Sequence, residues 1–503
     1  MPAGTITLAG CLALLGEAAR TSDGPVDIVI RDGRIARIAP AGSAPPEGRV
    51  IDARRRLCTP GLVNGHTHSH EGFFKGRHEN LPLELWMNNV RPNPPIAFTE
   101  RQVYLRTLIG AIEALRSGTT TIVDDLNVSP TLDPRLVEAA FRAYRDIGIR
   151  AYVGITLFDR PFFRGMPLVD ELFPPALLAE LDALPKPDGA ALLDFFRDLA
   201  GRYHWSRDRV SVIAAPSAPQ RCTDDFLCAI RAIADAHDLP AMIHVQETRL
   251  QAVAGPMMYG CTMVEHLGRL GFLKPRTTLI HGVWLRPQEV ALIAASGATV
   301  QHNPLSNLKL GSGIAPVRAL LDAGVNVSLG TDGCGSIETV NMQAVLAGAA
   351  LLHKVRGDDP ARWVGAAEAF RAATLGGATA LGRGGELGAV AEGRIADLAL
   401  YRLDSIPFAP LNDARGQLVY NETGASLDLL LVGGEPVMEG GRLLRIDEAA
   451  ILGEIGEEHR ALMPEIQRAE RDAGRISEAY RRIVDQCRMM ALAPDTYEAT
   501  LRH

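Results

Sequence analysis

Short apolar segments alternate with amphipathic, helix-length segments through the middle of the chain. Eight β-branched or apolar segments predict buried strands, at 62–68, 119–125, 150–157, 210–215, 240–245, 277–283, 298–302 and 325–330. Helical patterns fit 99–117, 134–147, 224–237, 286–296 and 316–323. Eight parallel strands with crossover helices make up a (β/α)8 barrel, the TIM-barrel fold of the α/β class, which we predict for residues 58–389.

The helical pattern at 99–117 illustrates the crossover helices. Thr99 is a favoured N-cap residue and Gly118 suits the C-terminal end. One apolar stripe runs between them, made of Leu105, Leu108, Ile109, Ile112 and Leu115. A doubly wound open sheet is the alternative, but no G-x-G-x-x-G motif follows a strand, so the barrel is favoured.

Both ends of the chain carry β patterns. Strands at 26–30 and 34–38 flank Asp32-Gly33, a two-residue hairpin signal. Further strands are expected at 396–402, 427–432 and 436–438. Neither group has enough strands to bury a sheet face alone. We therefore expect residues 1–57 and 390–445 to combine into one small β-sandwich domain, with the barrel inserted between them.

The segment 446–503 is charged and helical in pattern, with Ile451, Leu452 and Ile455 on one face. This C-terminal helical tail either covers the barrel or joins a second subunit. We expect a homo-oligomer.

Candidate chemistry lies at the predicted strand ends. His66 and His68 stand two apart on one strand, so their side chains project to the same face. Other strand ends carry His244, Glu247, His281 and Asp332. A histidine in an apolar strand is commonly a core residue, and Asp before Gly is commonly a turn. Their repeated occurrence at the carboxyl ends of strands, where barrel enzymes place their chemistry, instead favours a zinc or ferrous iron site.

The composition indicates a soluble globular protein and argues against nucleic-acid-binding, membrane-spanning and secreted proteins. The 503 residues are 47% hydrophobic and 22% charged, as in soluble globular proteins with one large and one small domain. The net charge of −7 gives no basic surface for nucleic acid. Neither a membrane-spanning apolar run nor a signal peptide is visible. Seven cysteines without a C-x-x-C spacing fit a cytoplasmic protein and exclude a cysteine-based zinc knuckle.

Longer motifs extend over nearly the whole chain. They are P-G-L-V-N-G-H-T-H at 60–68, L-P-L-E-L-W at 81–86, S-G-T-T-T-I-V-D at 117–124, H-V-Q-E-T at 244–248, H-G-V-W-L at 281–285, H-N-P-L-S-N-L-K-L-G-S-G-I-A-P at 302–316, L-G-T-D-G at 329–333 and E-G-R-I-A-D-L at 392–398. With these motifs the chain resembles the amidohydrolase superfamily. Within it, the similarity is to the cytosine deaminase-like branch that includes S-adenosylhomocysteine deaminases, guanine deaminases and triazine hydrolases.

The resemblance implies a barrel with a β-sandwich and one divalent metal, with zinc favoured over ferrous iron. The ligands that it implies are His66, His68, His244 and Asp332. Binuclear relatives need a lysine at the end of strand four, whereas this chain reads V-S-V-I-A-A-P-S-A-P there. A single metal is therefore predicted.

The predicted function is hydrolytic deamination of an amino-substituted nitrogen heterocycle of purine, pterin, pyrimidine or triazine type. A divalent metal lowers the pKa of water from 15.7 to about 7. Asp332 would accept the proton of this water, His281 would polarise the substrate, and Glu247 would protonate a ring nitrogen. The alternatives are displacement of chloride or alkylamine from a triazine, hydrolysis of a cyclic amide, or a non-catalytic metal-binding relative.

Departures from the family pattern bear on the substrate. Ser217 stands where nucleoside-type deaminases have a histidine, and Ile337 replaces the usual asparagine after T-D-G. A planar, neutral or weakly polar small molecule without ribose is therefore expected. The candidate substrate contacts are Trp86, Ser217, Gln220 and His302. For His302, a structural role is the alternative to substrate contact. His70 is assigned no metal role. The loops 69–98 and 158–208 would select the substrate.

Overall fold

Eight parallel strands form the centre of the structure, a computed structural model that describes residues 4–91, 95–128, 132–356 and 359–500. They lie in two four-stranded sheets, ordered β10-β9-β8-β7 and β11-β12-β13-β14. Their bounds are β7 Leu62–Thr67, β8 Thr119–Leu126, β9 Arg150–Ile155, β10 Val210–Val212, β11 Ala241–Val245, β12 Thr277–His281, β13 Thr299–His302 and β14 Asn326–Leu329. All eight strands lie where the apolar pattern predicts them.

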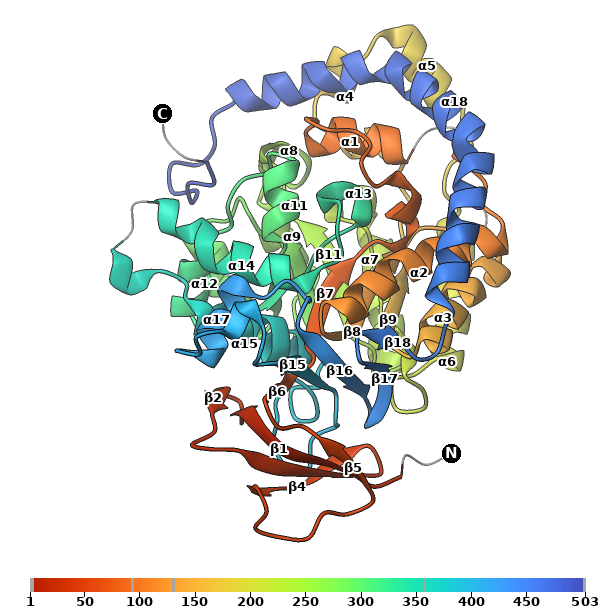
Figure 1. The fold of residues 1–503 in the computed structure, drawn as a ribbon. Coiled ribbons are helices and arrows are strands. Elements are labelled where there is room, and N and C mark those ends of the chain that lie inside the picture. The colour runs from red at the N-terminus through yellow and green to blue at the C-terminus, as the bar shows by residue number, and fades with distance from the viewer. Residues whose placement is uncertain (1–3, 92–94, 129–131, 357–358, 501–503) are drawn as a thin grey trace.

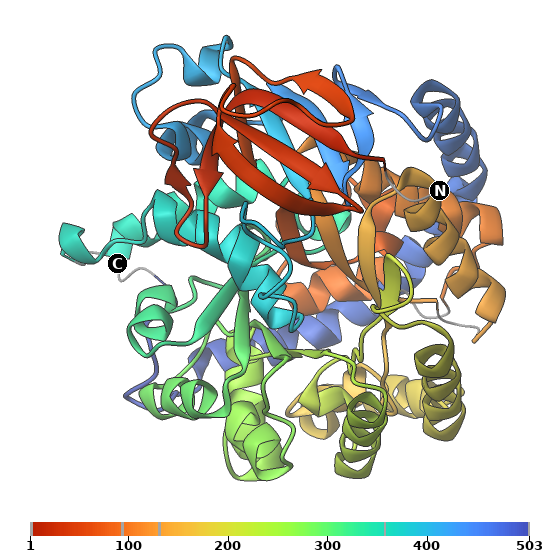
Figure 2. The ribbon, with the colours of Figure 1, turned by 90° about the horizontal axis from the view of Figure 1, so that it is seen from below.

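The edges of the two sheets meet on both sides. An isolated parallel bridge joins Ala214 to Ala241, and the Met242 amide donates to the Ala214 carbonyl at 2.8 Å. On the other side, the Asp332 amide donates to the His66 carbonyl at 2.9 Å. Helices lie outside these strands (Figure 2). This layering brings the carboxyl ends of strands from both sheets to one end of the molecule.

The predicted crossover helices are present as α2 (Glu100–Arg116), α3 (Pro134–Ile147), α7 (Asp224–Ala236), α10 (Pro287–Ser296) and α12 (Val317–Asp322). Thr99 caps α2 as expected, because its hydroxyl accepts from the Gln102 amide while the Gln102 side chain accepts from the Thr99 amide. The C-cap is Ser117, one residue before the expected glycine. Gly118 has a φ of +87°, and a Cβ there would lie 2.2 Å from the Tyr401 hydroxyl oxygen.

Further helices connect or cover the strands. They are α1 (Leu83–Val90), α4 (Val169–Leu172), α5 (Pro175–Asp182), α6 (Gly189–Arg202), α8 (Arg249–Tyr259), α9 (Met263–Arg269), α11 (Pro304–Lys309), α13 (Cys334–Ile337), α14 (Met342–Leu352), α15 (Ala366–Arg371), α16 (Gly377–Ala380) and α17 (Ala414–Asn421). Two short 3₁₀ helices matter for the site, η1 (Ser69–Phe74) and η3 (Pro219–Arg221).

The two chain ends share one ten-stranded mixed sheet, ordered β18-β17-β16-β15-β6-β1-β3-β4 with β2 and β5 paired to β1. Its strands are β1 Ile6–Leu15, β2 Arg20–Thr21, β3 Val26–Arg31, β4 Arg34–Pro40, β5 Arg49–Asp52, β6 Arg56–Pro60, β15 Leu398–Arg402, β16 Leu427–Val432, β17 Glu435–Glu439 and β18 Arg442–Leu443. The predicted pairing across the chain occurs between β6 and β15, where Cys58 lies opposite Leu400. Leu8, Ile28 and Leu429 belong to one buried apolar cluster of this sheet, whereas Leu430 and Val432 belong to the large core cluster.

The C-terminal segment forms the long helix α18 (Glu448–Met489), which arches over the end of the molecule that carries α1 (Figure 1). The Asn88 side chain donates to the Ala473 carbonyl at 2.7 Å, and Arg77 pairs with Glu470 at 2.6 Å. After α18 the chain returns to the strand-end loops, where the Ile314 amide donates to the Ala499 carbonyl. Of the two roles considered for this tail, covering the rest of the chain is therefore observed. No helix within the described ranges is long and apolar enough to cross a bilayer.

Candidate active site

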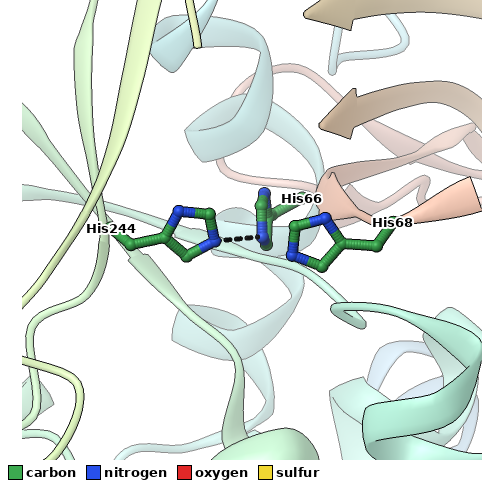
Figure 3. Close-up of side chains that lie close together, drawn as sticks. All are labelled: His66, His68 and His244. Atoms are coloured by element: carbon green, nitrogen blue, oxygen red, sulfur yellow. Dashed lines mark hydrogen bonds between the residues drawn. The ribbon is translucent and has the colours of Figure 1, made fainter. Parts of the chain in front are cut away.

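Three histidines and one aspartate from three strand ends converge on one point. Strand β7 supplies His66, His68 follows it directly, β11 supplies His244, and Asp332 follows β14. The Nε2 atoms of His66 and His244 are 3.2 Å apart (Figure 3). Asp332 Oδ1 lies 3.3 Å from His68 Nε2 and 3.6 Å from His66 Nε2. The structure thus brings together the four residues that the resemblance implies as metal ligands.

Backbone carbonyls orient two of these imidazoles. His68 Nδ1 lies 2.9 Å from the Asp125 carbonyl oxygen, and His244 Nδ1 lies 2.8 Å from the Ser217 carbonyl oxygen. A carbonyl only accepts, so each ring carries its proton on Nδ1 and directs the Nε2 lone pair inward. Burial lowers the pKa of His66 and of His244 well below the ordinary range. These two rings are therefore neutral, the form in which histidine binds metals.

The spacing of these atoms fits a divalent cation. Ligands about 2.0–2.1 Å from a tetrahedral metal lie roughly 3.3–3.4 Å from one another. The three contacts among His66, His68, His244 and Asp332 measure 3.2, 3.3 and 3.6 Å. His66 Nδ1 is buried without a partner among the described residues, so no contact there fixes a proton on His66 Nε2, and both Nε2 atoms can face one cation. The residues present therefore suit one divalent metal.

A second group of possible ligands lies next to the first. His68, His70 and Glu71 have ligand atoms within 4.8 Å of one another. The guanidinium of Arg91 is 3.2 Å from His70 Nε2, however, and its charge opposes a second cation there. Burial, the largest influence, raises the pKa of Glu71 to about 7. The sequence analysis did not single out Glu71 and assigned His70 no metal role, and the string H-T-H-S-H-E places both residues directly after the first two proposed ligands.

The predicted proton-transfer residues lie beside the histidine cluster. His281 Nε2 is 3.6 Å from Glu247 Oε2 and 3.9 Å from Asp332 Oδ2. Burial and then the charges of Asp332 and Glu84 raise the pKa of Glu247 well above its ordinary range, so its carboxyl group favours the protonated form. His281 and Asp332 both have positive φ angles, +75° and +70°. Such strained backbone is concentrated at functional sites.

A pocket of about 60 Å³ opens onto this cluster, and a cavity of about 1180 Å³ adjoins it. Three of the four predicted substrate contacts, Trp86, Ser217 and Gln220, line the small pocket. Trp86 Nε1 and Gln220 Oε1 are buried and have no hydrogen-bond partner among the residues that the structure describes. His302 lies apart from this lining, with its ring 5.2 Å from that of His353. Residues 92–94 of the predicted loop 69–98 lie outside the described residues.

The sequence as a whole matches the Amidohydrolase family over residues 57–437. A 5'-deoxyadenosine deaminase of Methanothermobacter thermautotrophicus is 32% identical, with 84% of this chain and 92% of that protein covered. A 5-methylthioadenosine/S-adenosylhomocysteine deaminase of Pyrococcus furiosus is 34% identical, with 85% of this chain and 94% of that protein covered.

Solved structures of amidohydrolase-type enzymes are also similar to this chain. The zinc complex of an atrazine chlorohydrolase from Arthrobacter aurescens superposes with a TM-score of 0.82 at 26% identity, covering 90% of this chain and 100% of that one. An adenosine deaminase from Xanthomonas campestris with bound zinc gives a TM-score of 0.78 at 28% identity, covering 92% and 98%. The fold is therefore of the TIM-barrel type. The chain belongs to the amidohydrolase family and is a hydrolase that acts on carbon–nitrogen bonds.

Proposed function

We propose that this chain is a metal-dependent hydrolytic deaminase that replaces the amino group of a planar nitrogen heterocycle with oxygen and releases ammonia. The observation that carries the proposal is the buried Glu247 carboxyl group, 3.6 Å from His281 at the edge of the histidine cluster, where burial raises its pKa well above the ordinary range. The relatives named above are deaminases of adenosine-type compounds, which supports the same reaction class.

One divalent metal, with zinc favoured, would be held by His66, His68, His244 and Asp332. When bound, such a metal makes hydroxide available at neutral pH by lowering the pKa of water. Asp332 is positioned to accept a proton, because Oδ1 faces His66 and His68 while Oδ2 accepts from the Ser306 hydroxyl at 2.6 Å.

Glu247 and His281 would act on the substrate itself. Addition of hydroxide to an amino-bearing ring carbon disrupts the aromatic ring, and protonation of the adjacent ring nitrogen lowers the barrier to that addition. Glu247 can supply this proton, because its carboxyl group favours the neutral form. The Glu247 carboxylate can then take up the proton of the added hydroxyl group as the ring carbonyl forms and pass it to the amine, which leaves as ammonia. The proton that Asp332 accepted from water would restore the Glu247 carboxyl group. His281 would polarise the reacting part of the substrate through Nε2, which faces Glu247 and Asp332.

Displacement of chloride or alkylamine from a triazine is the second candidate, and hydrolysis of a cyclic amide is less well supported. The high structural similarity to an atrazine chlorohydrolase favours the triazine reaction as the alternative. Chloride needs no proton to leave, so this reaction would make less use of Glu247 as a carrier of protons to the leaving group.

We also propose that the chain is divided into a barrel, a composite β-sandwich and a helical tail. We take the two four-stranded sheets as one closed (β/α)8 barrel within residues 58–389, supported by the contacts at both sheet edges. The composite β-sandwich would comprise residues 1–57 and 390–445, and the helical tail residues 446–503. We also propose a cytoplasmic location, from the cysteine pattern described above, and a homo-oligomeric state.

A substrate panel tests the function. The zinc-loaded protein is incubated with purines, pterins, pyrimidines and triazines, together with adenosine and 5-methylthioadenosine, and released ammonia and chloride are measured separately. We expect ammonia from at least one ring with an N=C–NH₂ unit, and its loss in Glu247→Gln. Chloride release, or opening of a cyclic amide without ammonia, would contradict deamination.

A further inference from the structure

Two arginines stand where the small pocket meets the large cavity. Arg91 and Arg221 line both spaces, together with Met87 and Phe162. Arg221 is only 7% exposed, and Arg91 is half-buried. Across the described part of the chain, no carboxylate lies within ion-pairing distance of either guanidinium. A buried cation without a counter-ion is costly, so this pair is unusual inside a protein.

The guanidinium of Arg221 is fixed in place. Its Nε donates to the Arg160 carbonyl at 3.2 Å, and its central carbon lies 4.4 Å from the ring centre of Phe158 and 5.4 Å from that of Phe162. Stacking on aromatic faces holds a guanidinium while leaving its terminal N–H groups free to donate. Burial, and next the charge of Arg91, lower the pKa of Arg221 to about 10, so it remains charged at neutral pH.

One donor of Arg91 also has no acceptor within the described ranges. Its Nε is buried without a partner, and its Nη2 lies 3.2 Å from His70 Nε2. His70 Nδ1 lies 3.2 Å from the Asn127 amide nitrogen, so contacts on both ring nitrogens hold this imidazole in place. The buried Nε–H of Arg91 therefore remains as a donor for an oxygen that a ligand supplies.

The other charged side chains that line the two spaces are engaged elsewhere. Arg164 lines the same large cavity but pairs with Asp170 at 2.6 Å and with Asp182. Among the acids of the small pocket, Asp332 faces the histidine cluster, Glu247 faces His281, and Glu71 accepts from the Gly335 amide at 3.0 Å. Asp125 acts on both guanidinium groups from beyond ion-pairing distance, and its Oδ1 accepts from the Thr156 hydroxyl at 2.6 Å. Both guanidinium groups line space that a ligand can occupy.

We propose that Arg91 and Arg221 bind a carboxylate carried by the heterocyclic substrate. The inference rests on the proposed function and specifies its substrate as an anionic ring, in contrast to the neutral or weakly polar ring expected from the sequence. A planar carboxylate matches the paired N–H groups of guanidinium. The His70 ring, 5.1 Å from that of His68, separates Arg91 from the cluster. The carboxylate is therefore attached to the ring directly or by a short arm.

Calorimetric titration of the zinc-loaded full chain with pterin and with pterin-6-carboxylate tests this proposal. Both rings carry the N=C–NH₂ unit, and only the second carries the anion. We expect the carboxylate to bind roughly 10- to 100-fold more tightly, because hydrogen bonds to charged groups contribute about 1.5–3 kcal/mol. Arg221→Gln and Arg91→Gln should abolish the difference, Arg221→Lys should retain part of it, and the matched control Arg164→Gln should keep it.

The results of this titration distinguish a failure of the carboxylate site from a failure of the proposed deamination. Equal affinity for the two pterins, no binding of either at millimolar concentration, or equal losses for both rings in the arginine variants would overturn the carboxylate site. If Arg221→Gln does not fold, Arg91→Gln and Arg221→Lys provide the comparison. A carboxylate preference that disappears with the arginines supports the site even if neither pterin releases ammonia, a result that would count against deamination of these rings alone.

Discussion

His281 Nδ1 lies 2.8 Å from Asn307 Oδ1, which fixes the imidazole as the Nδ1–H tautomer. The Nε2 lone pair therefore points toward Glu247 and Asp332, at 3.6 and 3.9 Å. Both distances exceed a direct hydrogen bond, so they leave room for a reacting group between the three side chains. Asn307 lies on α11, outside the strands, and holds the orientation of a histidine that a strand supplies.

Asn307→Ala should lower kcat by about 10- to 100-fold, the usual cost of losing a residue that orients an active-site histidine. KM and the zinc content should change little, because Asn307 is not among the proposed ligands. Steady-state kinetics and elemental analysis check this. Asn307→Asp keeps the acceptor oxygen and should retain more of the rate. Equal loss in both variants would contradict the orienting role.

Removal of a proposed ligand should affect metal content selectively. His244→Ala should reduce bound zinc to well below one per chain after gel filtration, because it removes one of four ligand atoms. His302→Ala is the matched control, since this histidine is also buried at a strand end but packs on His353. Its zinc content should stay near that of the wild type. Similar losses in both variants would mean that the ligand set is wrongly assigned.

The strands and the histidine cluster could be predicted because both depend on local regularities. Apolar runs mark buried strands, and parallel strands with crossover helices bring their carboxyl ends together. His66, His68 and His244 are therefore placed by strand position alone. His302 shows the limit of that reasoning. Its neighbour Gln301 accepts from Ser328 on the adjacent strand, whereas the ring of His302 packs against His353. Alternation of side chains then accounts for its separation from the pocket.

The residues that line the pocket from outside the strands could not be predicted in the same way. Glu71 lies in η1 and Arg221 in η3, short 3₁₀ segments without a periodic pattern. Arg91 follows α1, whose position depends on packing against α18. These positions are set by contacts between segments hundreds of residues apart, such as Asn88 with Ala473. Sequence periodicity carries no information about such contacts.

Glu247→Gln and His281→Asn should keep the fold and the metal while losing rate. Positioned acid–base groups typically contribute about 10²–10⁴-fold, so losses of this size are expected in kcat/KM for ammonia release. Circular dichroism and zinc analysis provide the controls. A Glu247→Gln variant as active as the wild type would argue for a leaving group that needs no ring protonation, and so for the triazine alternative.

The buried carboxyl group of Glu289, which contacts the turn before Glu247, should make the stability of the folded protein depend on pH. Its carboxylate accepts from the Arg286 amide at 2.8 Å and lies 3.3 Å from Gln246 Nε2, which also donates to the Trp284 carbonyl at 2.7 Å. Gln246 has a φ of +54° and precedes Glu247, so this contact supports the turn that presents the proposed acid. Burial, the largest influence, raises the pKa of Glu289 from 4.5 to about 7.

A raised carboxyl pKa means that the folded state favours the neutral form. The stabilisation from neutral Glu289 is therefore fully present below about pH 4.5 and is lost as the pH rises through about 7. Glu289→Gln mimics the neutral form at every pH. Its melting temperature relative to the wild type should rise between pH 5 and pH 8, with a change in unfolding free energy of about 2–3 kcal/mol. Melting curves of both proteins at pH 5, 6, 7 and 8 measure this, and a difference independent of pH would contradict the assignment.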